Sequence, residues 1–212
     1  MMKRKNEKKK GLIYYWLLVC VQVVLAVLIG LGAFIYHSQT QVSGGFNDTE
    51  LSNNLETAIH TNFINEIAPL AQNAQKKYHV LSSITLGQAC LESDWGQSGL
   101  SQKYHNLFGI KAYGNVPTIK LDTQEYENGE WITIKGEFRV YDSYAASVNG
   151  HSELFTEGTT WNPNQYESVL KAKDYITAAK AVQSSGYATD PDYADKLIAI
   201  IQKYDLEKYD KL

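Results

Sequence analysis

The spacing of hydrophobic and polar residues changes several times along the chain, and the first apolar segment is also the longest. Residues 11–36 contain no charged side chain, and about 20 apolar residues are enough to cross a bilayer as a helix. Residues 1–10 carry six Lys or Arg and one Glu, and basic flanks of this kind stay in the cytoplasm. The pattern predicts a single-pass transmembrane signal-anchor at 11–36, with a cytoplasmic tail at 1–10 and the rest of the chain outside the cell.

A cleaved signal peptide is the alternative interpretation, because it also has a basic start and an apolar middle. The apolar part of a signal peptide is about 7–15 residues long, which is much shorter than this segment. We therefore favour an uncleaved anchor, although the small residues Gly30, Gly32 and Ala33 leave a late cleavage open.

Polar residues dominate the next segment, 37–60, which we expect to form an extracellular stalk that grades into a helix. Residues 61–212 have the usual length of a domain with one core and show no internal repeat.

Most apolar residues of this domain recur at the spacing of an amphipathic helix. A first helix is predicted over 61–79, which Pro69 would kink or split, and a buried helix then ends near Glu92. A short helix and a glycine-punctuated loop follow within 99–115. Four more helices are predicted at 143–157, 164–172, 174–184 and 191–204, the last with Asp190 as N-cap and Pro191 at its first position.

Between these helices, residues 117–141 alternate apolar and polar side chains with the period of a β-strand. Asn128-Gly129 separates two such runs and is the strongest short signal for a hairpin. A third strand-like run, Glu137 to Tyr141, follows Gly136. The fold class is therefore α+β and mainly helical, with a small antiparallel β lobe and a cleft between two lobes that places Glu92 at the seam.

Charge and cysteine content limit the partners. Without the basic tail, the chain has 14 Lys or Arg and 22 Asp or Glu, so it lacks the basic surface that nucleic acids require. Cys20 lies in the apolar segment and Cys90 in a predicted buried helix, so we expect no structural disulfide. An exported domain without disulfides fits a bacterium of the Gram-positive type.

The five histidines do not have the spacing of metal ligands, and we expect neither a metal nor a cofactor.

Two carboxylates stand in unusual positions. Glu92 ends an apolar helix beside Trp95, and Glu125 pairs with Ile132 on the apolar face of the predicted hairpin. Each could be a solvated surface charge. Together, one on a helix end and one on a facing hairpin, they suit glycoside hydrolysis, in which one carboxylic acid protonates the leaving oxygen. Burial would raise the pKa of such an acid.

The residues around these carboxylates resemble a known family. The segments "LGQACLESDWGQSGLSQKYHNLFGIK", "TQEYENGEWITIKGEFRVYDSYAASVNGHSELF" and "SGYATDPDYADKLIAII" are similar, in this order, to glycoside hydrolase family 73, the bacterial peptidoglycan N-acetylglucosaminidases that include the catalytic domain of flagellar rod proteins. The likeness covers about 61–205. It implies a lysozyme-like fold and cleavage of the β-1,4 bond after N-acetylglucosamine, as an endo-acting enzyme.

The resemblance also implies roles for individual residues. Glu92 matches the general acid of the family, Glu125 its second carboxylate, and Tyr187 a tyrosine at the catalytic centre, while "NLFGIK" matches a motif of the cleft wall. The expected substrate-binding residues are Tyr187, Trp95, Asn106, Phe108, Tyr126 and Trp131. His105 and Cys90 depart from the residues that are usual in the family, without consequence for the chemistry.

Several alternatives remain at this point. Glu125 could activate a water with inversion, or the N-acetyl group of the substrate could take part instead. An N-acetylmuramidase, a lytic transglycosylase of the same fold and a non-catalytic wall-binding scaffold are the rival functions. In each case the expected partner is the peptidoglycan glycan strand, bound by a monomeric domain held at the membrane.

Overall fold

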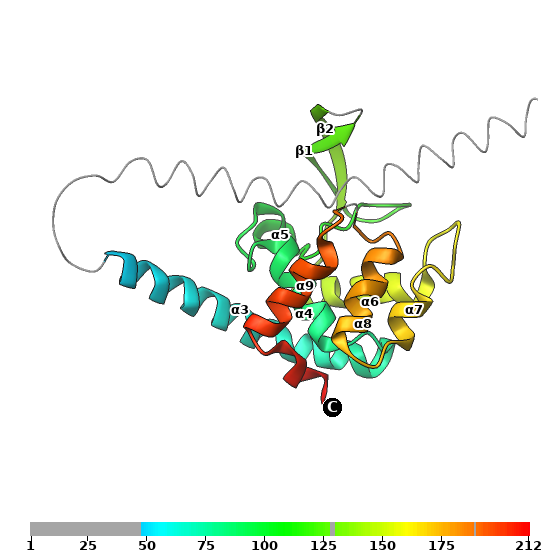
Figure 1. The fold of residues 1–212 in the computed structure, drawn as a ribbon. Helices are drawn as coiled ribbons and strands as arrows, with labels where there is room; N and C mark the ends of the chain where they lie inside the picture. Colours follow the sequence, from blue (N-terminus) through cyan, green and yellow to red (C-terminus); the bar gives the residue numbers. More distant parts are fainter. Residues whose placement is uncertain (1–47, 128–129, 189) are drawn as a thin grey trace, which may run out of the picture.

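A computed structural model describes residues 48–127, 130–188 and 190–212, and leaves undescribed the side chains of 123–132 in the hairpin (Figure 1). Helices and one hairpin make up this part of the chain. Their bounds are α3 (Asp48–Tyr78), α4 (Ser82–Ser93), α5 (Gly99–Tyr104), β1 (Thr118–Glu127), β2 (Glu130–Arg139), α6 (Tyr144–Glu157), α7 (Glu167–Lys171), α8 (Tyr175–Ser184), α9 (Tyr193–Lys203) and the 3₁₀ helix η1 (Leu206–Asp210). The architecture confirms a mainly helical fold with one small antiparallel sheet.

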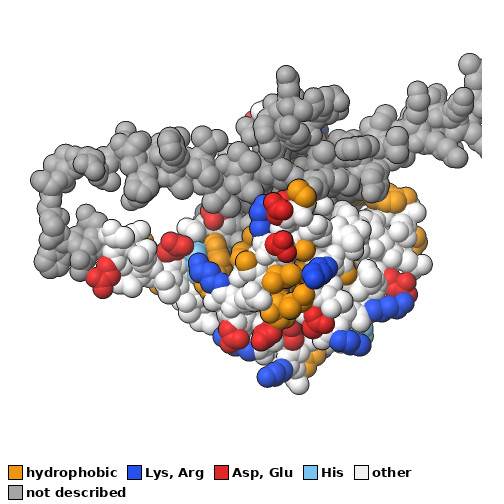
Figure 2. All heavy atoms as spheres, in the orientation of Figure 1, with side chains coloured by type: hydrophobic (Ala, Val, Ile, Leu, Met, Phe, Trp, Pro, Cys, Tyr) orange, Lys and Arg blue, Asp and Glu red, His pale blue; other side chains and the backbone are white. Residues whose placement is uncertain are grey.

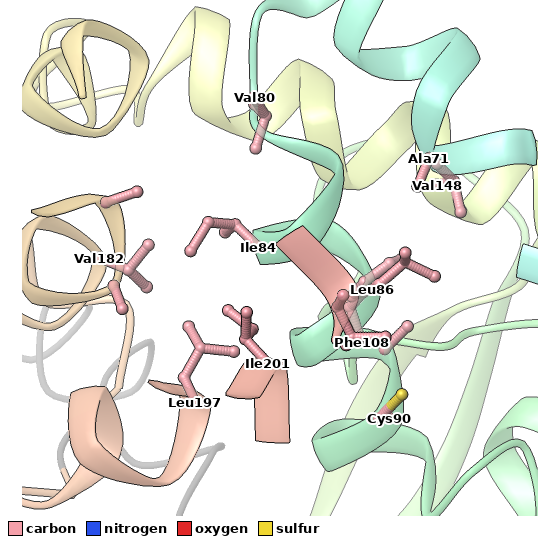
Figure 3. Packing of buried hydrophobic residues seen from close by; sticks show 14 of the residues in the cluster. Ala71, Val80, Ile84, Leu86, Cys90, Phe108, Val148, Val182, Leu197 and Ile201 are labelled. Atoms are coloured by element: carbon pink, nitrogen blue, oxygen red, sulfur yellow. The ribbon is translucent and has the colours of Figure 1, made fainter. Parts of the chain in front are cut away.

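Helix α4 lies at the centre of the helical body and is buried on almost every side. Ile84 on this helix faces Val182 of α8 and Leu197 and Ile201 of α9 (Figure 3). Gly87 lets α9 approach, because a Cβ atom there would lie 2.6 Å from Cδ1 of Leu197. The central position explains why the sequence around Glu92 is apolar on more than one face.

The N-terminus of α4 is held by side chains from distant parts of the sequence. The backbone N–H and the hydroxyl of Ser82 donate to Oε1 of Gln75, at 2.7 and 2.6 Å. The corresponding groups of Ser83 donate to the two carboxylate oxygens of Asp210, both at 2.7 Å. These contacts satisfy N–H groups that a helix start leaves without intrahelical partners.

Helix α3 is one continuous helix with Pro69 inside it, and it begins at Asp48, within the segment expected to be a stalk. Its N-terminal turns extend beyond the helical body in Figure 1, and they expose Leu51 and Leu55. The low apolar content of these turns explains why periodicity placed the helix start too late.

The β hairpin projects away from the helices (Figure 1). Its register confirms the predicted strand pairing, since Glu127 pairs with Glu130 and Glu125 with Ile132. The prediction of a separate third strand is wrong, because β2 runs without a break through Gly136, which pairs with Leu121. A glycine weakens a strand, but here the continuous ladder overrides it.

The predicted start of the last helix is wrong by a short distance. Helix α9 begins at Tyr193, and Asp190 instead accepts a hydrogen bond from the N–H of Asp192 at 2.9 Å and pairs with Lys196. The Asp-Pro pair thus forms a turn ahead of the helix.

The predicted membrane anchor at 11–36 lies outside the described residues, and among the helices that are described none has the length and apolar character of a membrane span. Over the described residues on the face in Figure 2, acidic and basic side chains are interspersed and do not gather into a basic patch.

Candidate active site

Glu92 lies in the last turn of α4, where the helix ends abruptly. Asp94, Trp95 and Gly96 all have positive φ angles, of 52°, 56° and 77°. The hydroxyl of Ser93 holds this bend by donating to the carbonyl of Ala89 at 2.6 Å and accepting from the N–H of Gly96 at 2.7 Å. The bend carries the chain away from the helix and leaves Glu92 at its end.

Replacing Gly96 with Ala should destabilise this bend. Its φ of 77° disfavours a side chain, and a Cβ atom would lie 2.8 Å from the ring of Phe63. We expect the free energy of unfolding to fall by about 1–3 kcal/mol, measured by thermal or urea unfolding. Gly99→Ala is the matched control, since a Cβ there meets no described atom within 4 Å. An equal loss in both variants would contradict the explanation.

Glu92 is buried, with only 6% of the residue exposed. Burial raises its pKa to about 8, although the hydroxyl of Tyr193, which donates to Oε1 at 2.9 Å, opposes this rise. At pH 7 the group is therefore a neutral carboxylic acid. A neutral acid with a pKa near the working pH is what proton donation to a leaving oxygen requires.

Three further polar side chains lie behind Glu92, and all are buried. Tyr193 of α9 accepts from Nε2 of Gln88 at 3.0 Å, and Oε1 of Gln88 lies 3.0 Å from Nε2 of His151 on α6. The pKa of His151 is lowered to about 3 by burial, so its imidazole is neutral. The acid is thus tied into the core through a chain of hydrogen bonds.

Tyr187 connects this centre to an open groove. It is buried, with its ring centroid 6.1 Å from that of Tyr193, and it lines a cavity of about 240 Å³. The cavity also has the aromatic residues Tyr113, Trp161 and Tyr166 in its wall. Glu92 is not among the described residues that line it, and Tyr187 is linked to the acid through Tyr193, which donates to Glu92.

Trp95 was expected to bind substrate beside Glu92. Its ring instead stacks on His60, with centroids 3.7 Å apart, and packs edge-on against Phe63 and Tyr204. These contacts join the bend after α4 to α3 and α9, and they favour a structural role for this side chain.

Asn106 and Phe108 are both almost fully buried. The amide of Asn106 donates to the carbonyls of Ile110 and Arg139, at 2.9 and 2.8 Å, and its oxygen accepts from the N–H of Ile110 at 3.0 Å. The side chain therefore fixes the loop against β2, which favours a structural role over the expected substrate contact. Phe108 stacks on His151 with centroids 3.9 Å apart, so it also supports the buried centre.

The remaining candidates are on the hairpin. Glu125 pairs with Ile132 and Tyr126 with Trp131, as expected from the turn. In the described part of the hairpin, Phe138 and Gly136 are buried while their neighbours Glu137 and Lys135 are exposed. By alternation Glu125 belongs to the set that contains Phe138. The side chains of Glu125, Tyr126 and Trp131 lie outside the described part, and their roles stay predictions.

Sequence reasoning missed three residues around the acid: Gln88, His151 and Tyr193. Gln88 and Tyr193 are 105 positions apart in the chain, and His151 and Gln88 are 63 apart. A signal was present for Tyr193, because it immediately precedes the apolar face of the last helix. His151 was considered only as a metal ligand, and a buried histidine with a polar partner cannot be recognised from spacing.

Comparison with known proteins places the chain in a family. The family profile described as "Glucosaminidase: Mannosyl-glycoprotein endo-beta-N-acetylglucosaminidase" matches residues 68–206. The exo-glucosaminidase LytG of Bacillus subtilis is 41% identical over 219 residues, which cover 100% of this chain and 71% of LytG. The peptidoglycan hydrolase FlgJ of Escherichia coli K12 is 40% identical over 66% of this chain, which spans 45% of FlgJ.

Solved structures agree with this result. The catalytic domain of the autolysin Auto from Listeria monocytogenes superposes with a TM-score of 0.67 and 32% identity, covering 79% of this chain and 99% of that domain. The glycoside hydrolase domain of FlgJ from Salmonella typhimurium gives a TM-score of 0.56 and 36% identity, covering 69% of this chain and 97% of that domain. The expected resemblance is confirmed over nearly the expected residues: the chain belongs to the glucosaminidase family of glycoside hydrolases.

Proposed function

We propose that this protein hydrolyses the β-1,4 bond after N-acetylglucosamine in the glycan strands of peptidoglycan, with Glu92 as the general acid. The observation that carries the proposal is the buried carboxyl of Glu92, whose pKa is raised to about 8 and which a tyrosine hydroxyl holds in place. Glu125 is the second carboxylate in this proposal, acting from the β lobe. The glycan would run along the groove that Tyr187 lines.

Names of relatives support the substrate class but differ in the details. LytG is named an exo-glucosaminidase, the family profile an endo-acting enzyme, and FlgJ a peptidoglycan hydrolase. A protein of Lactococcus lactis that is 36% identical over 70% of this chain is named a probable N-acetylmuramidase. We propose the glucosaminidase bond, with N-acetylmuramidase activity as the second candidate.

Reducing-end analysis of digested peptidoglycan tests both candidates. The full chain in detergent is incubated with purified sacculi, and the new ends are reduced with borohydride and identified by mass spectrometry. We expect N-acetylglucosaminitol ends. Muraminitol ends would support the muramidase, and anhydromuramyl ends would show a lytic transglycosylase. If no new ends appear, the proposal that this protein hydrolyses the glycan is wrong.

Size analysis of the products separates endo from exo action. Large glycan fragments at early times indicate internal cleavage, whereas monosaccharide or disaccharide from the first minutes indicates release from chain ends. We expect early large fragments, as the sequence resemblance implies.

We also propose that residues 11–36 anchor the enzyme in the membrane with the catalytic domain outside. Protease added to wall-stripped cells should then remove the catalytic domain and leave a small membrane-bound fragment that contains the N-terminus. Recovery of the protein in the medium with a new N-terminus near residue 34 would show cleavage instead.

A further inference from the structure

Four buried polar side chains from three helices form an unbroken hydrogen-bonded chain that ends at the acid. His151 of α6 contacts Gln88 of α4 at 3.0 Å, Gln88 contacts Tyr193 of α9 at 3.0 Å, and Tyr193 contacts Glu92 at 2.9 Å. His151 and Gln88 are fully buried, and Tyr193 is 5% exposed. A chain of this length in a low-dielectric interior is stable only if every contact joins a donor to an acceptor.

The contacts in the structure run in one direction. A neutral imidazole donates from one ring nitrogen and accepts at the other, so Nε2–H of His151 donates to Oε1 of Gln88. The amide of Gln88 then donates to the oxygen of Tyr193, whose O–H donates to Oε1 of Glu92. Each donor points toward the acid.

The same four residues could also be connected in reverse. The amide of Gln88 would rotate, Tyr193 would donate to Gln88 instead of Glu92, and a protonated Oε1 of Glu92 would donate to Tyr193. His151 would then accept at Nε2 and carry its proton on Nδ1. That nitrogen is buried without a hydrogen-bond partner among the described residues, and an unpaired buried N–H donor is costly. The environment of His151 therefore disfavours the reversed chain.

We propose that His151 is a positioning residue that sets the direction of this chain, so that Tyr193 donates to Oε1 of Glu92 and the transferable proton stays on Oε2. In the reversed chain the proton would sit on Oε1 and be engaged with Tyr193, where it could not pass to a leaving oxygen. This inference deepens the proposed function and rests on Glu92 being its general acid.

Few titratable groups face this chain in the described part of the structure. Tyr193 faces Glu92 from α9, and its own pKa is raised well above the usual value by burial and by Glu92. Tyr187 packs against both His151 and Tyr193. Glu125 is the other carboxylate of the proposed mechanism. The neutral His151 contributes no charge, so it would act through hydrogen-bond direction alone.

The test measures the pH dependence of kcat for the full chain, using release of reducing ends from peptidoglycan. His151→Phe keeps a ring that can stack on Phe108 but removes the donor. We expect kcat to fall about tenfold. The alkaline limb of the pH profile, where kcat declines as Glu92 loses its proton, should move up by about half a pH unit or more, because Glu92 loses a hydrogen bond that lowers its pKa. Tyr193→Phe should move the limb in the same direction.

The double variant distinguishes positioning from simple packing. If His151 acts through Tyr193, the variant with both His151→Phe and Tyr193→Phe should be no slower than Tyr193→Phe alone. His151→Gln should restore the alkaline limb, because its amide N–H can replace the Nε2–H donor. Val148→Ala, a buried change on the same helix outside the chain, should lower stability without moving the limb.

An unchanged alkaline limb in His151→Phe, or losses that add fully in the double variant, would overturn the proposal. Should His151→Phe fail to fold, Gln88→Met carries the same test, since it removes both hydrogen bonds of Gln88 at similar volume. A wild-type enzyme without activity on peptidoglycan would instead contradict the proposed function, so the two failures are distinguishable.

Discussion

Replacing Glu92 with Gln should reduce glycan hydrolysis by about 10³-fold while leaving the fold intact. The amide keeps the size of the side chain and can still accept from Tyr193, but it has no proton to give to the leaving oxygen. General acids contribute about 10²–10⁴-fold to catalysis. The measurement is the initial rate of reducing-end release from purified peptidoglycan, with circular dichroism as the check on folding.

Asp94→Asn is the matched control for this loss, since Asp94 lies two positions further along and has a left-handed backbone that Asn tolerates well. It should retain most of the activity. Near-normal activity of Glu92→Gln would remove the basis of the proposed mechanism.

The same substitution should stabilise the protein at neutral and alkaline pH. The pKa of Glu92 is raised to about 8 from an ordinary value of 4.5, so the folded state binds this proton more tightly than the unfolded state. The stability associated with that proton is complete below pH 4.5 and is lost as the pH rises toward 8. Glu92→Gln avoids the loss, and we expect it to be more stable than the wild type by about 1–3 kcal/mol at pH 7.

Thermal unfolding of both proteins across the pH range measures this effect. At pH 4 the two should have similar stability, and the difference should grow with pH. A difference that does not depend on pH would mean that burial does not perturb Glu92 as the structure indicates.

Replacing Glu125 with Gln should slow hydrolysis about 10²-fold or more if this residue activates the attacking water. Its carboxyl would then be about 6.5–9.5 Å from that of Glu92, and the product would form as the α-anomer. If the N-acetyl group of the substrate attacks instead, the loss should be smaller and the product should be the β-anomer. We expect inversion, and NMR of the anomeric protons during early turnover decides between the two.

Glu137→Gln provides the control on the same hairpin. Glu137 lies on its exposed face and pairs with Lys120 at 2.9 Å, and exposed ion pairs contribute little. Its activity should be close to that of the wild type. An equal loss in the two hairpin variants would indicate that the hairpin needs its net charge, without a special role for Glu125.

Local signals explain which parts of the fold could be predicted. Taking Asn128-Gly129 as a two-residue turn predicts one register for the whole hairpin, and the observed strand pairs agree with it. Helix α6 was predicted to within one residue, since Ser143 caps it by accepting from the N–H of Ala146 at 3.1 Å. The start of α3 was not predicted, because its exposed first turns lack an apolar stripe.

The sequence could indicate a residue of the candidate site only where a charged side chain interrupts an apolar segment. A glutamate at the end of a buried helix is such an interruption, and it identified Glu92. Gln88 and His151 look like ordinary polar residues in the sequence, since what makes them important is contact with each other across 63 positions. Trp95 was chosen for its position near Glu92 in the sequence, and its packing against His60, Phe63 and Tyr204 could not be read from that position. Its role in substrate binding stays a prediction.

The way in which Asp210 binds the start of α4 has a consequence for when the enzyme becomes active. Asp210 lies 127 positions after Ser83, and the helix that carries the acid packs between segments from both ends of the domain. Contacts at such separation form late, because a long loop must close first. A growing polypeptide can therefore complete the contacts that hold the start of α4 only after synthesis has passed residue 210, and we expect lytic activity to follow that point.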